Sequence, residues 1–324
     1  MKWNVLDLHC DTALALLGRD LKPKNALRRN PGHIDLERGG RLGGYAQCFA
    51  MFTFPGFEEE FGCPVPRVFD AMVENLQREL KENDDLIRQA RSADEIRANQ
   101  AAGKMSAILT VEGPAGLDFD PGRLEQLYET GFRISTLGWN EKNVLSGSNQ
   151  TGGGLTERGR AYVRECQRLG ILVDVSHLSD EGFWDIMDIT QAPVIASHSS
   201  SRAVCGHPRN LTDEMFTAIC RTGGTAGINL YTDFLGEKKV TLDTVCDHIF
   251  HFLELDPEGT HISLGGDLDG CSALPEGFTG VDSYSLLAEQ LMKRGLSEEA
   301  VRRIFWNNAM GVMDHAVCNH KKRS

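Results

Sequence analysis

No apolar run in the sequence approaches the roughly 18 residues that a membrane-spanning helix requires. The residues before Asp7 contain no apolar core of a signal peptide, so we expect none. Basic residues are also scarce, since 34 lysines and arginines face 46 acidic residues and the net charge is −12. Nucleic acids and anionic membranes attract basic proteins, so this charge argues against both as partners. Together these absences predict a cytoplasmic protein.

Paired cysteine motifs are missing as well. The nine cysteines are scattered, their number is odd, and no Cys-X-X-Cys pair occurs. A disulfide framework or a cysteine-based zinc site would need regular pairs. We therefore expect reduced thiols, several of them buried as small apolar side chains.

Eight apolar segments of strand length alternate with segments of helical periodicity. The predicted strands cover residues 4–12, 45–52, 105–111, 132–137, 171–176, 193–197, 225–230 and 261–266. Such alternation is typical of a parallel sheet, and eight units predict an α/β fold, the (β/α)8 or TIM-type barrel. Barrels of this kind often exceed about 250 residues, and no low-complexity linker divides the chain, so we predict one domain over residues 1–324.

Three predictions concern the segments between strands. Residues 53–66 and 146–154 are rich in Gly, Pro or Ser and are predicted to be loops over the surface or a pocket. Residues 68–100 show helical periodicity amid dense charge and are predicted to be helical throughout. Thr212 is predicted as the N-cap of a following helix, whose first turn is acidic.

Side chains that bind metals follow the predicted strands at the same place in successive units. They are His9 and Asp11, Glu112, His177, His198 and Asp267. In a barrel the carboxyl ends of the strands converge on the active site. Each residue alone could be structural, as a hydrogen-bonded core histidine, a turn residue or a helix cap, but their common register favours a metal site.

The ligand types indicate the chemistry. Three imidazoles and two carboxylates exceed the needs of one tetrahedral zinc, whereas two ions about 3.5–4 Å apart, bridged by a carboxylate, would use them all. A hydroxide bridging two such ions is a nucleophile at neutral pH. A further carboxylate that is not a ligand can act as general base and acid.

Six short motifs carry a resemblance that runs over nearly the whole chain. They are His9-Cys10-Asp11, Val111-Glu112-Gly113, Asp174-Val175-Ser176-His177, Ser197-His198-Ser199-Ser200, Arg209-Asn210 and Gly265-Gly266-Asp267-Leu268-Asp269-Gly270. In this set and order the chain resembles the membrane (renal) dipeptidase family of zinc peptidases, within the amidohydrolase superfamily.

The resemblance implies two zinc ions per chain. It implies that His9 and Asp11 bind one zinc and that His177 and His198 bind the other. Glu112 resembles the bridging carboxylate and is counted with the catalytic residues for that reason. Homodimers are usual among the proteins that this chain resembles, so a homodimer is expected.

Further roles follow from the same resemblance. Asp267 resembles the acid and base that passes a proton from the hydroxide to the leaving amine. Arg209 matches the residue that binds the terminal carboxylate of the substrate, and a guanidinium fork suits that group. Trp139 stands where animal members carry a histidine thought to polarise the scissile carbonyl. Indole cannot take a proton, so polarisation would fall to zinc, Trp139 or Asn140. Trp139 and Asn140 are therefore candidate substrate-binding residues. Tyr231, at the end of the predicted strand 225–230, is a third candidate.

The leading hypothesis is a binuclear zinc dipeptidase that hydrolyses L,L and also L,D dipeptides by attack of the bridging hydroxide. One alternative is another amide or lactone hydrolase on the same scaffold. A second alternative is a metal-binding protein without turnover, in which Trp139 marks the loss of activity.

Overall fold

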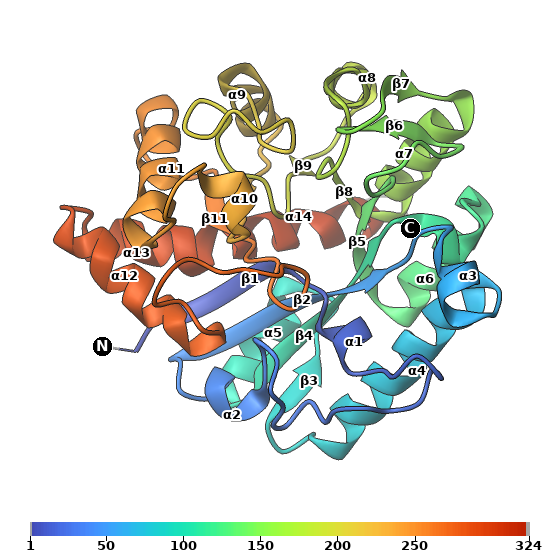
Figure 1. Cartoon of the computed structure of the whole chain (residues 1–324), viewed down its shortest axis with the longest axis horizontal. Coiled ribbons are helices and arrows are strands. Elements are labelled where there is room, and N and C mark those ends of the chain that lie inside the picture. Colours follow the sequence, from blue (N-terminus) through green and yellow to red (C-terminus); the bar gives the residue numbers. More distant parts are fainter. Residues whose placement is uncertain (1, 322–324) are drawn as a thin grey trace.

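The computed structural model describes residues 2–321, with side chains for residues 2–315. Its central element is a ring of eight parallel strands (Figure 1). In chain order they are β1 (Asn4–Cys10), β2 (Gly44–Phe52), β4 (Met105–Glu112), β5 (Phe132–Thr136), β8 (Leu172–Asp174), β9 (Val194–Ile195), β10 (Ala226–Ile228) and β11 (Ile262–Leu264). β1 pairs with β11, and a bridge from Ala196 to Ala226 completes the circle between β9 and β10. The predicted (β/α)8 barrel is confirmed.

The inner face of the barrel is apolar. In-register pairing places side chains such as Ile108 of β4 and Cys48 of β2 on the same face. The inner cluster contains Leu6, Leu8, Ala46, Cys48, Ile108, Ile134, Leu172 and Ile195, joined by Ala309, Met310 and Met313 of the last helix. A barrel of eight strands is just wide enough for side chains to fill, so the catalytic groups are confined to its mouth.

Helices surround the strands (Figure 1). They are α1 (Thr12–Ala15), α2 (Leu36–Gly39), α3 (Phe57–Phe61), α4 (Val65–Glu82), α5 (Ala93–Ala101), α6 (Leu124–Thr130), α7 (Glu157–Leu169), α8 (Asp180–Ile189), α9 (Asp213–Arg221), α10 (Thr232–Leu235), α11 (Leu242–Leu255), α12 (Tyr284–Lys293), α13 (Glu298–Arg302) and α14 (Asn308–Lys321). A larger apolar cluster fills the space between helices and strands. Within it, Phe69 of α4 stacks on Phe132 of β5, with ring centroids 5.7 Å apart. Thr212 caps α9 by accepting a hydrogen bond from the Met215 N–H, as predicted.

Three local predictions are wrong. The segment 68–100 is not one helical region, because β3 (Ile87–Gln89) separates α4 from α5 and pairs with β4 outside the ring. The predicted loop 53–66 contains α3, whose first turn carries three glutamates that suit the positive end of the helix dipole. The predicted loop 146–154 forms the antiparallel hairpin of β6 (Ser146–Ser148) and β7 (Gly152–Leu155). Strands this short and glycine-rich leave no periodic apolar pattern to detect.

Three consecutive helical segments form the end of the described chain. α13 ends at Arg302, a π-helical turn covers Arg303–Asn307, and α14 continues the chain. The Asn308 side-chain amide donates to the carbonyls of Gly259 and Ile262, which ties the start of α14 to the beginning of β11 and the turn before it.

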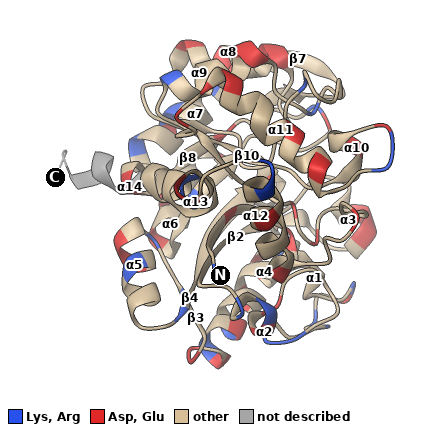
Figure 2. Cartoon of the chain, turned by 90° about the vertical axis from the view of Figure 1, so that its left-hand side faces the viewer, with Lys and Arg blue, Asp and Glu red and all other residues tan. Residues whose placement is uncertain are grey.

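The distribution of charged residues and the state of the cysteines agree with what the amino-acid composition predicts. Acidic and basic residues are interspersed over the outer helices and loops (Figure 2). The eight cysteines among the residues with described side chains are all free thiols. Within residues 2–321, no helix combines the length and the apolar character needed to cross a bilayer.

Candidate metal centre

Five predicted metal ligands come together at the mouth of the barrel. The carboxylate of Glu112, the last residue of β4, lies at their centre. One of its oxygens is 3.2 Å from His9 Nε2, and the other is 2.9 Å from His177 Nε2 and 3.5 Å from His198 Nε2. Asp11 Oδ2 lies 3.9 Å from His9 Nε2. One carboxylate therefore touches three imidazoles that are up to 189 residues apart in the chain.

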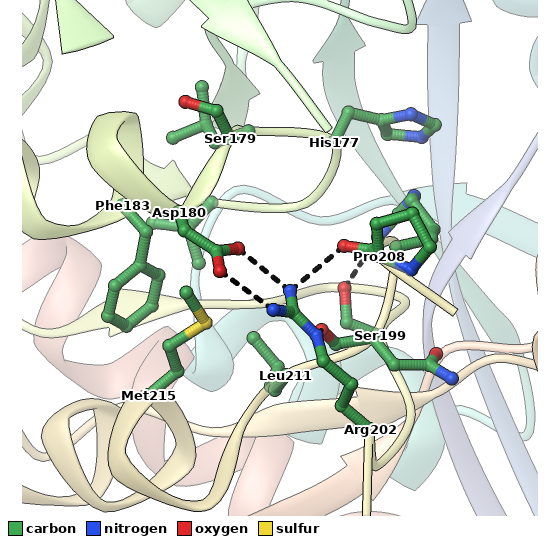
Figure 3. A pocket seen from close by; sticks show the side chains of 13 residues that line it. His177, Ser179, Asp180, Phe183, Ser199, Arg202, Pro208, Leu211 and Met215 are labelled. Atoms are coloured by element: carbon green, nitrogen blue, oxygen red, sulfur yellow. Dashed lines mark hydrogen bonds and ion pairs between the residues drawn. The ribbon is translucent and has the colours of Figure 1, made fainter. Parts of the chain in front are cut away.

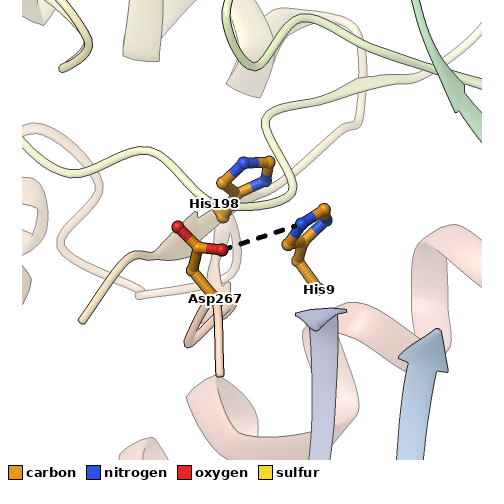
Figure 4. Close-up of side chains that lie close together, drawn as sticks. All are labelled: His9, His198 and Asp267. Carbon is orange, nitrogen blue, oxygen red and sulfur yellow. Dashed lines mark ion pairs between the residues drawn. The ribbon is translucent and has the colours of Figure 1, made fainter. Parts of the chain in front are cut away.

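The ligand atoms fall into groups small enough to hold an ion. Within each group the atoms lie within 4.8 Å of one another. The groups are His9, Asp11 and Glu112; Glu112, His177 and His198; and His9, His198 and Asp267. The first two share Glu112 and divide the ligands as the resemblance implied. Figure 4 shows the third group, in which the Asp267 carboxylate faces the imidazoles, 3.8 Å from His9 Nε2.

A register shift in β1 directs His9 into the site. β1 and β2 pair regularly up to Asp7, and then one extra residue in β1 moves the register before Cys10. Asp7 stabilises the shift, since its buried carboxylate accepts hydrogen bonds from the N–H groups of His9 and Gly266 and from the Tyr284 hydroxyl. Bulges of this kind commonly re-aim a side chain beside an active site.

The expected strand conformation of Asp11 is wrong. β1 ends at Cys10, and Asp11 is the residue that precedes α1. Its carboxylate nevertheless reaches the cluster through the turn rather than through strand alternation.

Hydrogen bonds fix the tautomers of two histidines. His177 Nδ1 lies 3.0 Å from the Asn140 side-chain oxygen, which can only accept. His198 Nδ1 lies 2.6 Å from the Ser197 hydroxyl, and that hydroxyl donates to the Asp174 carboxylate. Both Nδ1 atoms therefore carry the proton, and both Nε2 lone pairs point into the cluster.

This donor set fits a bound metal. The Nε2 atoms of His177 and His198 are only 2.9 Å apart, and two unprotonated acceptors at that distance repel each other. His9 Nε2 and Asp11 Oδ1 are buried and have no hydrogen-bond partner among the described residues. Divalent cations among these atoms would remove the repulsion and satisfy the unpaired groups.

The electrostatics of the cluster are strongly perturbed. Burial is the largest influence on His9 and opposes its protonation, but the neighbouring carboxylates of Glu112, Asp11 and Asp267 together outweigh it and raise the pKa of His9 to about 10. Burial, aided by Arg209, lowers the pKa of His177 to about 4. Burial raises the pKa of Asp267 to about 6, while its hydrogen bond from Asn229 opposes the rise. Such perturbed groups cluster at functional sites.

Backbone strain marks the same residues. His177 and Asp267 have positive φ angles of 73° and 55°, which residues other than glycine rarely adopt. The glycine that follows in the same turn, Gly270, leaves no room for a side chain, because a Cβ there would lie 2.1 Å from Asp11 Oδ2. Strained positions of this kind persist where the surroundings fix them, and they gather at active sites.

Arg209 lies beside the cluster and is prepared to bind an anion. Its guanidinium is buried and donates one hydrogen bond, from Nη1 to Ser199 Oγ at 2.7 Å. Its Nε and Nη2 atoms have no partner among the described residues. Figure 3 shows the pocket beside His177 and Ser199, where Arg202 pairs with Asp180 at 2.7 Å and holds the loop that carries Arg209.

The other three candidate residues surround the cluster in different ways. Trp139 is half-buried and packs on Phe52 and Phe54, with ring centroids 5.0 and 5.1 Å away. Asn140 uses its side-chain oxygen on His177, a contact that motif spacing did not reveal. Tyr231 packs on Phe234 at 4.9 Å, and Phe234 in turn lies 5.8 Å from the Arg209 guanidinium.

Sequence reasoning missed several supporting residues. They are Asp174 and Ser197, which orient His198; Ser199, which holds Arg209; and Asn229, whose amide donates to Asp267 Oδ2 at 3.1 Å. Asp174, Ser197 and Ser199 occur inside motifs already noted, so the signal was present. Asn229 lies near the end of the predicted strand 225–230, and that position was the available clue.

Comparison with known proteins gives consistent results. The family model described as membrane dipeptidase (peptidase family M19) matches residues 1–324. Dipeptidase verJ of Clonostachys rogersoniana is 31% identical over 304 residues, which cover 87% of this chain and 75% of that protein. An uncharacterized dipeptidase of Schizosaccharomyces pombe is 36% identical over 214 residues, which cover 64% of this chain and only 52% of that protein.

A solved structure extends the similarity to three dimensions. It is a metallo peptidase from Rhodobacter sphaeroides liganded with a phosphinate mimic of the dipeptide L-Ala-D-Ala. Its sequence is 27% identical to this chain and the TM-score is 0.86. The superposition covers 98% of this chain and 100% of that chain.

Proposed function

Starting from the membership of this chain in the membrane dipeptidase family, peptidase family M19, we propose that it is a binuclear zinc dipeptidase. The family makes it a metal-dependent hydrolase of the dipeptidase class. The number and identity of the ions, the ligands and the substrate range are our proposal. We also propose that residues 1–324 act as one domain, while the cytoplasmic location and the homodimer stay predictions from sequence.

The position of Glu112 is the observation that carries the proposal. Its two oxygens face different histidines, with His9 on one side and His177 and His198 on the other. A carboxylate that serves two ions needs this arrangement. We assign His9 and Asp11 to one zinc, the other two histidines to the second, and Glu112 to both. When bound, the two ions would supply Lewis acidity at the scissile carbonyl.

The chain itself would supply the remaining chemistry. Arg209, desolvated and held by Ser199, would bind the terminal carboxylate of the dipeptide. Asp267, oriented by the Asn229 amide, would accept a proton from the attacking water and deliver it to the leaving amine. Its pKa of about 6 suits a group that must gain and lose a proton near neutral pH.

The substrate class follows from the same features and from one relative. Because Arg209 would bind the terminal carboxylate of the substrate beside the metal centre, it favours cleavage of the peptide bond that precedes the C-terminal residue. The Rhodobacter sphaeroides peptidase was solved with a mimic of L-Ala-D-Ala, which supports acceptance of a D-residue on the C-terminal side. We therefore propose both L,L and L,D dipeptides as substrates.

Metal analysis and a substrate panel test the proposal together. We expect two zinc ions per chain by elemental analysis, and hydrolysis of L,L and L,D dipeptides in preference to N-acyl amino acids and lactones. Asp267→Asn should lose turnover and keep its zinc. Turnover confined to lactones or other amides would favour a different hydrolase, and full zinc content without any hydrolysis would favour a metal-binding protein without turnover.

A further inference from the structure

Glu141 is a buried carboxylate that the proposed mechanism does not use. It lies between β5 and β6, at the mouth of the barrel, two residues after Trp139. Both of its side-chain oxygens are buried, and neither has a hydrogen-bond partner on another described residue. Burying an ionisable carboxylate without a partner is unfavourable. A ligand group that pairs with this carboxylate would therefore lower the free energy of the site.

The segment that carries Glu141 is held firmly against the metal centre. The side chain of Asn140 contacts His177 Nδ1 at 3.0 Å, and its backbone oxygen accepts a hydrogen bond from Ser148 Oγ at 2.6 Å. Farther along, the Asn143 amide donates to the carbonyl of Leu137 at 3.0 Å. Glu141 is therefore fixed by its neighbours, and its unpaired carboxylate is not the result of a loose loop.

Glu141 also interacts with the centre electrostatically. Burial raises the pKa of Glu141, and the negative charge of Glu112 raises it further. The two carboxylates are therefore close enough to influence each other. A cation bound beside Glu141 would offset this repulsion.

In the barrel order, the strands that precede Glu141 and Arg209 lie on either side of the strand that precedes His177. β5, β8 and β9 are neighbours in that order. Glu141 follows β5, His177 follows β8, and Arg209 follows β9. A dipeptide is about 7 Å long and carries an ammonium at one end and a carboxylate at the other. Anionic and cationic side chains on either side of the reacting centre match these two ends.

We propose that Glu141 binds the α-ammonium group of the substrate and so selects peptides with a free amino terminus at the cleaved residue. The inference deepens the proposed function and rests on it. Asp11 Oδ1, also buried without a partner, is another available carboxylate acceptor, but it belongs to the metal cluster. Recognition of both ends would limit substrates to two residues, because a longer peptide would place an amide where Glu141 requires a charge.

A matched pair of substrates tests the role of Glu141. L-alanyl-D-alanine and N-propionyl-D-alanine differ only in the amino group, which is largely protonated at about pH 7. With zinc-loaded enzyme we expect Glu141→Gln to lower kcat/KM for the dipeptide about tenfold or more, and to leave the propionyl compound nearly unchanged. Glu129→Gln, on the exposed face of α6, is the matched control and should change neither value.

Equal losses on both substrates would mean that Glu141 acts through the structure of the loop, and no loss on either would mean that it binds nothing; both results overturn the inference. A thermal melt of Glu141→Gln checks its folding.

Binding separates this inference from the proposed function. Calorimetry with a phosphinate mimic of L-Ala-D-Ala, and with the same mimic lacking its amino group, needs no turnover. Selective loss of affinity for the amino compound in Glu141→Gln supports the inference even if no dipeptide is hydrolysed. Hydrolysis of dipeptides without any such selectivity sustains the dipeptidase and rejects the role of Glu141.

Discussion

Replacing Gly270 with alanine is expected to disable the site while leaving the fold intact. An alanine Cβ would lie 2.1 Å from Asp11 Oδ2 and 2.4 Å from Asp267 Oδ1. To restore an ordinary contact of 3.4 Å, the Asp11 oxygen would have to retreat by about 1.3 Å. The Gly270 backbone itself does not require positive φ, so the clash is confined to these two carboxylates.

The displacement can be converted into an expected rate. Misplacing a catalytic group by about 1 Å costs on the order of 100-fold. Because the alanine presses on both a metal ligand and the proton-transfer carboxylate, we expect kcat/KM for a dipeptide to fall by about 100-fold or more. Zinc content should fall as well, since Asp11 is one of only three ligands in its group.

The assay needs a control that separates the site from the fold. Gly311→Ala in α14 serves this purpose, because that glycine is exposed and a Cβ there meets no atom within 4 Å. It should keep full activity, and its free energy of unfolding should stay unchanged or rise by up to about 1 kcal/mol. Wild-type activity and zinc content in Gly270→Ala would refute the assignment of Asp11 and Asp267.

Four further predictions follow from individual contacts. Asn140→Ala should weaken zinc binding about 10- to 100-fold by chelator competition, because His177 loses the acceptor that fixes its tautomer; unchanged affinity would contradict this. Arg209→Met should raise KM for dipeptides much more than it lowers kcat, whereas an equal effect on dipeptide amides would argue against a carboxylate contact. Removing metal with a chelator should lower the melting temperature, because the cluster then keeps its unsatisfied buried groups, and re-addition of zinc should restore it. Burial lowers the pKa of His248, which bonds to Ser201 and Leu235, so the unfolded chain binds a proton more readily. The free energy of unfolding should then fall as the pH drops below the ordinary histidine value of about 6.5, and the slope should be shallower in His248→Gln.

The barrel and the positions of most candidate ligands could be predicted from the amino-acid sequence alone. Eight apolar segments separated by helical patterns leave few alternatives, because each strand must be buried on both faces. His177, His198 and Asp267 follow such segments directly, so their convergence is a consequence of parallel strands ending at one rim. Similarly, Thr212 could be recognised as a helix cap from its neighbours alone.

The orientation of these side chains depends on contacts between distant parts of the chain. His9 enters the site because one extra residue in β1 is stabilised by Asp7, whose partners include a residue 277 positions away. The β6–β7 hairpin forms by close backbone approach, since a Cβ on Gly147 would lie 1.9 Å from the Gly152 carbonyl. Asn140 acquires its role from His177, 37 residues later. Periodicity reports burial along a local stretch of chain, whereas hydrogen-bond partners are chosen through space, and no local pattern records them.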